Sequence, residues 1–408
     1  MRLHTLKTDK FKTVYIRVDF RRKIKKEEIT KRNILADMLN RGTKNYQTER
    51  EMIIQSEELY NANYGYNVCS SGNYSIMSFS ITSLSDKYTE SGNLEKVIKF
   101  LMDMLFNPNV NNKSFDEKTL NLSKNYIRKY IEDIYDSPRR YARSRIREIM
   151  SPNSPFSYHQ DGYIEDLEKI DGHNLYEYYL NVLKNDIVDI YVIGEYGNLD
   201  ILNNYFKESK EKKLNHIIEH KKYRASLKKV VESRNVRQST FTLGCKIEPM
   251  DAFEMQYVAS IYSFILGGSP DSKLFTHVRE KNSLCYSISS MIAPVTNSMF
   301  IYAGIDKKDY RKVLKETINQ IDAMSKGEFT EKDIENAKTT YKSSLKEIYD
   351  SLVSLASTIA SMEYLMYDSL EDRIKKIDMV TKDDIIKLSK KIKLDSVYLL
   401  KGVLDENN

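Results

Sequence analysis

Hydrophobic and polar residues alternate in several short stretches of the chain, and a period of two residues predicts β-strands. The clearest stretches are Val14–Phe20, Val188–Val192, Phe241–Ile247 and Val397–Leu399. Between them, apolar residues recur every three or four positions, as in helices that bury one face. Because an alternating strand has one apolar face, we expect sheets with one face under helices and the other face free. Strands that bracket pairs of helices indicate an α+β fold.

The chain also repeats itself. The segment Phe115–Ser137 returns 214 residues later as Phe329–Ser351, with the same opening Phe, the same Glu and Lys, and the same closing Ile-Tyr-Asp-Ser. Apolar residues occupy matching positions of one helical face in both copies. An internal repeat of this kind predicts two homologous α/β units, each a mainly antiparallel sheet packed against helices.

These patterns divide the chain into three parts. We place a first repeat at residues 1–205 and a second at residues 236–408. Residues 206–235 are rich in Lys, Glu and His and poor in apolar residues, which is typical of an exposed, charged linker.

Composition narrows the class of protein. Of the 408 residues 41% are hydrophobic and 30% charged, a globular balance. The net charge of +6 is spread without a basic stripe, so we expect no nucleic-acid partner. No run of 18 apolar residues occurs, and Met1–Phe20 lacks the apolar core of a signal peptide, so we expect no membrane contact and no export. The three scattered cysteines, Cys69, Cys245 and Cys285, fit reduced thiols in the cytoplasm.

Two segments carry a resemblance to a known family. They read ADMLNRGTKNY at Ala36–Tyr46 and SPDSKLFTHVREKNSLCYSISS at Ser269–Ser290. With the repeated order of elements, they resemble the pitrilysin/insulinase-type metallopeptidase superfamily over essentially the whole chain, in its mitochondrial-processing-peptidase-like branch. The first half also resembles the insulinase-like protein associated with elongation factor P modification. The resemblance implies that the two repeats form half of a clamshell.

The zinc motif of that superfamily is degenerate here. In active members, His-x-x-Glu-His on one helix holds zinc and activates its water. The matching positions are Asn33, Ala36 and Asp37, and the helix expected to supply a third ligand reads SKNYIRKY from Ser123 to Tyr130, without a carboxylate. Both imidazoles, the general base and the third ligand are missing together. We therefore expect no metal in this chain and no peptidase activity from the chain alone.

A literal His-x-x-Glu-His does occur elsewhere, at His216, Glu219 and His220. It lies in the charged linker, and no Glu between Glu280 and Glu316 could act as a third ligand at the superfamily's spacing. A solvated linker is the simpler interpretation. A metallopeptidase that uses His216, Glu219 and His220 is the alternative.

The second repeat keeps one further motif, Arg279 and Tyr286, seven residues apart. The resemblance implies that these side chains reach toward the zinc of a homologous partner subunit. A guanidinium or a phenol can stabilise the oxyanion that forms when an amide is attacked. The alternative is an ordinary surface arginine and a tyrosine that begins a core strand.

Two segments are candidates for binding a peptide substrate. Gly267 and Gly268 permit close backbone approach at a helix end, where the segment could line a cavity. The strand Tyr74–Ile81, with Tyr74 and Ile76, is predicted as a sheet edge to which a peptide could add.

The sequence as a whole predicts a non-catalytic subunit of a heterodimeric zinc peptidase. This subunit would bind peptides or small proteins and support the transition state, while the zinc would be in the partner. The alternative is a proteolytically inactive structural or binding protein with the same fold.

Overall fold

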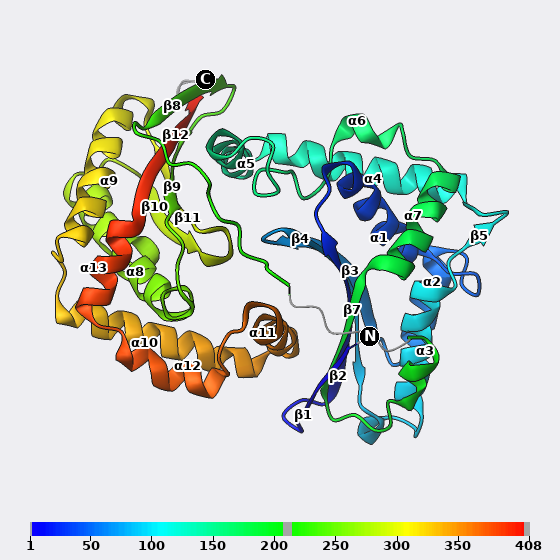
Figure 1. Ribbon diagram of the computed structural model, residues 1–408. Coiled ribbons are helices and arrows are strands. Elements are labelled where there is room, and N and C mark those ends of the chain that lie inside the picture. Colours follow the sequence, from blue (N-terminus) through cyan, green and yellow to red (C-terminus); the bar gives the residue numbers. More distant parts are fainter. Residues whose placement is uncertain (1, 207–213, 404–408) are drawn as a thin grey trace. The chain divides into compact units, whose positions relative to one another are not determined.

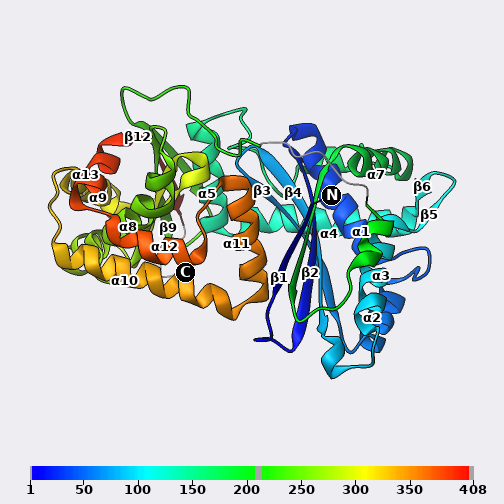
Figure 2. The same ribbon diagram turned by 60° about the horizontal axis from the view of Figure 1, so that its bottom comes forward.

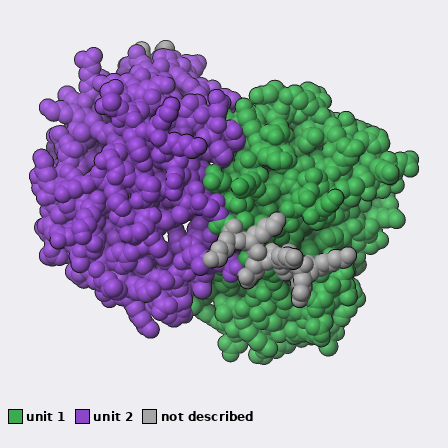
Figure 3. Space-filling model, in the orientation of Figure 1, with its two compact units in different colours: residues 1–133, 159–214, 349–361 green, residues 134–158, 215–348, 362–408 purple. Residues whose placement is uncertain are grey.

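The structure is a computed structural model that describes residues 2–206 and 214–403. The chain groups into two compact units, which Figure 3 colours separately. Unit 1 comprises residues 1–133, 159–214 and 349–361, and unit 2 comprises residues 134–158, 215–348 and 362–408. Two segments, 134–158 and 349–361, therefore belong to a different unit from the repeat in which they lie along the sequence.

Unit 1 is built on a five-stranded sheet with the order β1-β7-β2-β4-β3. Its first and last strands along the chain, β1 and β7, pair in parallel, and all other pairs are antiparallel. The strands are β1 (Arg2–Lys7), β2 (Thr13–Lys23), β3 (Asn63–Ser71), β4 (Tyr74–Leu84) and β7 (Ile187–Gly194). The short strands β5 (Val110–Asn111) and β6 (Ser114–Phe115) form a separate hairpin.

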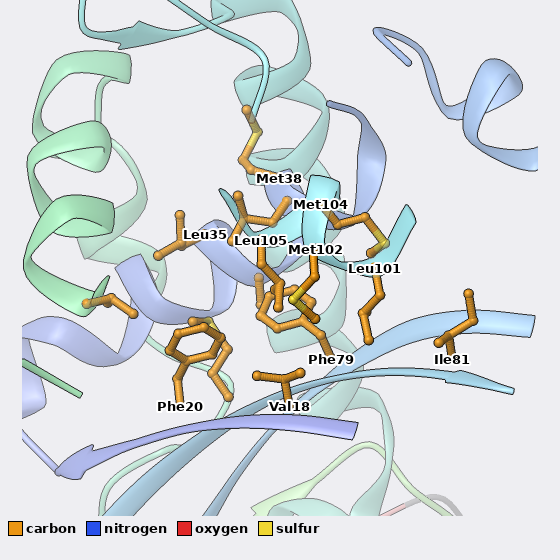
Figure 4. Packing of buried hydrophobic residues seen from close by; sticks show 14 of the residues in the cluster. Val18, Phe20, Leu35, Met38, Phe79, Ile81, Leu101, Met102, Met104 and Leu105 are labelled. Atoms are coloured by element: carbon orange, nitrogen blue, oxygen red, sulfur yellow. The ribbon is translucent and has the colours of Figure 1, made fainter. Parts of the chain in front are cut away.

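Helices cover one face of this sheet (Figures 1 and 2). They are α1 (Ile29–Arg41), α2 (Glu49–Glu58), α3 (Asn93–Phe106), α4 (Glu117–Asp136), α6 (Ile164–Leu167) and α7 (Gly172–Asn185). Figure 4 shows the core between the helices and the sheet, where side chains of β2 and β4 meet those of α1 and α3. The labelled residues are at most 4% exposed: Val18, Phe20, Leu35, Met38, Phe79, Ile81, Leu101, Met102, Met104 and Leu105. Each such side chain stabilises the fold by about 1.5–3 kcal/mol relative to exposure.

Unit 2 has a second five-stranded sheet, with the order β10-β11-β9-β12-β8. Its first and last strands, β8 and β12, again pair in parallel, while the other pairs are antiparallel. Starting from β8, the order matches unit 1 strand for strand. The prediction of two homologous α+β repeats with mainly antiparallel sheets is therefore confirmed. The strands are β8 (Lys228–Arg234), β9 (Ser239–Ile247), β10 (Ser287–Ala293), β11 (Ser298–Ile305) and β12 (Ile392–Gly402).

The helices of unit 2 follow the same plan. A helical segment at 254–268, which includes α8 (Ala259–Ser263), is followed by the helix Phe275–Lys281. The remaining helices with residues in this unit are α5 (Pro138–Met150), α9 (Tyr310–Ser325), α10 (Glu331–Glu347), α12 (Leu370–Lys376) and α13 (Lys382–Lys391). Helix α11 (Leu352–Leu365) begins in the segment that belongs to unit 1.

The sequence repeat is visible in the caps of its helices. Asp116 accepts a hydrogen bond from the backbone N–H of Thr119 at the start of α4, and Thr330, 214 residues later, caps α10 in the same way. The next helices, α5 and α11, begin after Ser137 and Ser351, whose hydroxyls accept the N–H three residues on. Each cap contributes about 1 kcal/mol to its helix, so the repeated residues fix the same helix starts in both halves.

The prediction that one sheet face is free is wrong in both units. In unit 2 every residue of β9 is buried, because α5 packs on the face opposite α8, α9 and α13 (Figure 1). Gly244 of β9 allows this approach, since a Cβ there would lie 2.4 Å from the sulfur of Met150. In unit 1 the second face carries charged residues that are buried in pairs, such as Arg17 and Asp19, with 3.1 Å between Nε and Oδ1. The polar residues that alternate along these strands therefore do not indicate a solvent-exposed face, because that face is covered in the folded protein.

The interpretation of residues 206–235 as an exposed linker is also wrong for much of the segment. Residues 207–213 lie outside the described part of the chain. Residues Lys228–Arg234 form β8, the edge strand of the unit 2 sheet, and His216, Ile218 and His220 are buried. Charged residues suit an edge strand, because they discourage pairing with another chain. The charge density that suggested a linker thus marks a protected sheet edge.

Within the described residues, no helix is both long and apolar enough to cross a membrane.

Candidate functional site

The three degenerate zinc positions lie together on α1, and each has a structural role there. Asn33 donates from Nδ2 to the carbonyl oxygens of Ile29 (3.0 Å) and Gln160 (2.9 Å). Ala36 is fully buried in the core under the helix. Asp37 is buried and accepts a hydrogen bond from the hydroxyl of Tyr66 on β3 at 2.9 Å. The helix that would hold a metal in an active peptidase is thus tied into its own unit.

A guanidinium supplies the positive charge beside Asp37. Nε of Arg41, one turn further along α1, lies 2.6 Å from Oδ2 of Asp37, and Nη1 lies 3.1 Å from Glu49. The guanidinium is also 5.7 Å from the ring of Tyr126, on the helix α4 that would supply the third zinc ligand. We call Asp37, Arg41, Glu49, Tyr66 and Tyr126 the Arg41 network.

Electrostatics hold the Arg41 network in this state. Burial by itself would lower the pKa of Arg41, but the hydrogen bond and the charge of Asp37 raise it above its usual value. The pKa of Tyr66 is raised by burial, by the charge of Asp37 and by their hydrogen bond. Arg41 therefore stays charged and Tyr66 stays protonated, so Asp37 is fully paired.

The donors that remain do not fit a zinc ion. Among the described residues, no group of three His, Cys, Asp or Glu side chains is placed to hold a metal. A divalent cation at Asp37 would also be repelled by the guanidinium of Arg41. The sequence showed that the zinc ligands are missing, but the role of Arg41 was overlooked. The spacing of four residues from Asp37 to Arg41 on a helix is a recognisable signal of an ion pair.

The literal His-x-x-Glu-His is neither a metal site nor a solvated linker. Residues 214–220 are not helical, and their side chains alternate, so that His216 and His220 are buried while Glu219 is exposed. Nε2 of His220 lies 3.0 Å from the hydroxyl of Ser298, and burial together with Lys246 lowers its pKa to about 4. The motif needs a helix to bring its three side chains to one face, and this segment has none.

Arg279 and Tyr286 both face solvent in unit 2. Arg279 lies on the helix Phe275–Lys281, with its guanidinium carbon 4.5 Å from the centre of the Phe275 ring. Tyr286 directly precedes β10 and is 61% exposed, while its backbone N–H is bonded to the carbonyl of Gly304 at 3.0 Å. The alternative of a surface arginine agrees with the exposure of Arg279, whereas Tyr286 directly precedes an edge strand and not a core strand. Among the described residues no hydrogen bond joins the side chains of Arg279 and Tyr286, so each can act as an independent donor.

The predicted substrate edge is wrong. Tyr74 and Ile76 belong to β4, which lies between β2 and β3 in the interior of the sheet, and Tyr74 is buried. The edge strand next to β4 is β3, which is joined to β4 by a turn at Gly72, where φ is +54°, and the other edge of the sheet is β1. Sequence reasoning missed β3 because its residues, NYGYNVCSS, include Gly and Asn, which are uncommon in strands. The matching edge in unit 2 is β10.

The glycine pair leads to a cavity in unit 2. Gly268 lines a space of about 630 Å³, whereas Gly267 is buried beside it, with room for no Cβ because Ser290 would be 2.8 Å away. The cavity is bounded by the end of the helical segment 254–268, by the turn and helix that follow, and by one side of α10. Its lining residues are Phe264, Ile265, Gly268, Ser269, Pro270, Asp271, Ser272, Lys273, Thr276, His277, Asp333, Asn336, Ala337, Thr339 and Thr340.

Comparison with known proteins agrees with this geometry. Residues 169–341 match the family model described as Peptidase M16 inactive domain. A Bacillus subtilis protein named probable inactive metalloprotease YmfF is 29% identical over 406 residues, which cover 98% of this chain and 95% of that protein. This chain is thus similar to peptidase M16 inactive domains over residues 169–341. The resemblance predicted from the sequence is confirmed, and both of these matches are described as inactive.

Further relatives show how widely this fold occurs. A second Bacillus subtilis protein, named uncharacterized zinc protease YmxG, is 26% identical over 299 residues, 72% of this chain and 71% of that protein. A solved structure of a conserved protein from Enterococcus faecalis V583 matches this chain with a TM-score of 0.91, at 27% identity over 100% of this chain and 97% of that one. A peptidase M16 inactive domain from Pseudomonas fluorescens, at 16% identity and a TM-score of 0.78, shares the fold.

Proposed function

We propose that this protein belongs to the M16 peptidase family and is the zinc-free, substrate-binding subunit of a heterodimeric peptidase, whose homologous partner carries the zinc. One observation carries the proposal: the zinc positions of unit 1 are replaced, whereas the Arg and Tyr of unit 2 are kept. In unit 1 the Arg41 network replaces the metal and its ligands. In unit 2 Arg279 and Tyr286 stay exposed, although nothing in the packing of unit 2 requires a solvent-facing phenol at that position.

The chemistry of Arg279 and Tyr286 suits support of a transition state. When the amide of a substrate is attacked, its carbonyl oxygen gains negative charge, and a guanidinium or a phenol can donate a hydrogen bond to it. Stacking on Phe275 limits the freedom of Arg279, and the bond to Gly304 fixes the backbone of Tyr286. Donors that are held in place before the reaction stabilise such charge without reorganisation. The partner would supply the metal and the general base.

Peptide binding fits the sheet edges. An extended peptide can add to β3 or β10 as a further strand through backbone hydrogen bonds, with little demand on its sequence. The two Bacillus subtilis relatives include one named as inactive and one named as a zinc protease, so both kinds of protein that such a pair requires occur in one organism. The three cysteines are free thiols, which is consistent with a cytoplasmic pair.

The proposal is tested by combining the chain with a zinc-bearing homologue from the same genome. The chain alone should contain less than one zinc by elemental analysis and should not cleave a short unstructured peptide, whereas the mixture should cleave it. Arg279→Ala or Tyr286→Phe should lower turnover of the mixture by about 10²–10³, the usual effect of removing one oxyanion donor. Gel filtration should show that both variants still assemble.

Matched controls are Arg311→Ala and Tyr223→Phe, which change an exposed arginine and an exposed tyrosine elsewhere in unit 2. Both should keep full activity. If Arg279→Ala and Tyr286→Phe also keep full activity, the two residues have no role in turnover. The better conclusion would then be a structural or peptide-binding protein without a part in proteolysis.

A further inference from the structure

The cavity of unit 2 lies where the sequence repeat matches the Arg41 network of unit 1. Helix α1 ends at Arg41 before Gly42, and the corresponding helical segment of unit 2 ends at Gly268. Tyr126 of α4, which lies against Arg41, corresponds to Thr340 of α10, 214 residues later. Thr340 lines the cavity. The second repeat is thus open at the helix end where the first repeat is filled.

Two side chains in the lining of this cavity, Lys273 and Ser272, have hydrogens that they can donate to a ligand. The ammonium group of Lys273 gives one hydrogen bond to the carbonyl of Glu328 at 2.7 Å, which leaves two of its three hydrogens. Ser272 is only 2% exposed, and its hydroxyl has no hydrogen-bond partner among the residues that the structure describes. A buried hydroxyl without a partner is unfavourable, so a ligand oxygen beside it would stabilise the site. Thr276 adds another hydroxyl to the lining.

The charged side chains that line the cavity are Lys273, Asp271 and Asp333, and Asp271 is exposed to solvent. Burial lowers the pKa of His277, and the nearby positive charges of Lys281 and Lys273 lower it further. Asp333 is the carboxylate on the α10 side, but its Oδ2 already accepts from the N–H and the hydroxyl of Thr330, both at 2.8 Å, in the cap of the helix. Burial lowers the pKa of Lys273, against the charges of Glu328 and Asp333, and no described salt bridge pairs its ammonium group with a carboxylate.

We propose that this cavity holds a carboxylate of a bound peptide, with Lys273 as its counter-ion and the hydroxyls of Ser272 and Thr276 as donors. The inference rests on the proposed function in one respect, namely that the chain binds peptides, and it adds a preference for acidic ones. The carboxylate could belong to an Asp or Glu side chain or to the C-terminus of the peptide, since the chemistry is the same.

The test compares labelled, unstructured peptides that differ in one group, by fluorescence anisotropy with the purified chain. One pair carries Glu or Gln at a single position, and a second pair ends in a free acid or an amide. The wild-type chain should bind the carboxylate member of at least one pair about tenfold more tightly, because hydrogen bonds to a charged group are about twice as strong as neutral ones. The pair that shows the preference identifies the source of the carboxylate.

Variants of Lys273 decide whether this cavity is responsible. Lys273→Met should abolish the preference, and Lys273→Arg should retain it. This pair of results would show that the positive charge at position 273, and not a change in folding, causes the preference. Lys273→Glu should reverse the preference toward a peptide with Lys at the same position. The control Lys332→Met removes an exposed lysine from the first turn of α10, outside the cavity, and should leave the preference unchanged.

The possible failures can be told apart. Tight binding of all peptides without preference would overturn this inference and leave the peptide-binding function standing. A preference that survives Lys273→Met would place the carboxylate elsewhere and would also overturn it. If the wild-type chain binds none of the peptides, both the inference and the peptide-binding function are wrong.

Discussion

Unit 1 and unit 2 share one topology, yet they differ in the space beside their first long helix. In unit 1, Asp37, Arg41 and Tyr126 fill the place where active peptidases hold zinc. In unit 2, Gly268 and Thr340 leave a cavity of about 630 Å³ at the matching helix end. The shared fold determines which helices lie beside this helix end. The side chains at that place determine whether it is occupied by protein atoms or forms a cavity.

The comparison also shows that the fold does not need a metal ion at this helix. A zinc ion ties its ligands together and neutralises their charge. In unit 1 the guanidinium of Arg41 does both, because it pairs with Asp37 of its own helix and with Glu49 of α2. A buried carboxylate without a partner would be unfavourable, and Arg41 removes that penalty for Asp37.

The largest expected effect concerns the filled site. Asp37→Ala should destabilise unit 1 by about 3 kcal/mol, the lower end of the range for breaking a buried ion pair, because Arg41 keeps some exposure. Glu49→Ala removes the exposed partner of the same arginine and should cost less than about 1 kcal/mol. Urea denaturation of both variants measures the difference. Similar losses for both would mean that Asp37 is no more important than a surface contact.

The second effect concerns the covered face of the unit 2 sheet. Gly244→Ala should destabilise the protein by about 1–3 kcal/mol, because the new methyl group would meet Met150 and Ile146 of α5. Gly65→Ala, on the edge strand β3 of unit 1, adds the same methyl group where no atom lies within 4 Å. Gly65→Ala should be neutral or slightly stabilising in thermal unfolding. Equal destabilisation by both would contradict the close packing of α5 on β9.

The smallest effect comes from exchanging the residues that make the two sites differ. Tyr126→Thr should destabilise unit 1 by about 0.5–1 kcal/mol, the value of an exposed cation–π contact. Thr340→Tyr should change stability little but reduce binding of carboxylate peptides, because the ring occupies the cavity. Ser343→Tyr, at an exposed position of the same helix outside the cavity, is the control. Peptide binding that survives Thr340→Tyr unchanged would show that the cavity is not the binding site.

Sequence reasoning succeeded where the signal is local. The repeat at Phe115 and Phe329 fixed two helices with the same caps, and the residues at 33, 36 and 37 excluded a zinc ligand set on α1. It failed for β3 and for β8. In β3 glycine and asparagine weaken the strand pattern, and in β8 charged residues resemble a linker, although pairing with a neighbouring strand stabilises both.

The sequence by itself determined the α+β class, the two repeats, the caps that start their helices and the absence of the zinc motif. These properties depend on residues close together along the chain, whose spacing is readable without a structure. Only the tertiary structure decided that α5 covers the second face of the unit 2 sheet and that β3 is an edge strand of the unit 1 sheet. It also decided that Tyr126 contacts Arg41, whereas Thr340 lines a cavity. Such contacts join residues far apart in the sequence, and they depend on how side chains share volume after the sheets and helices have packed.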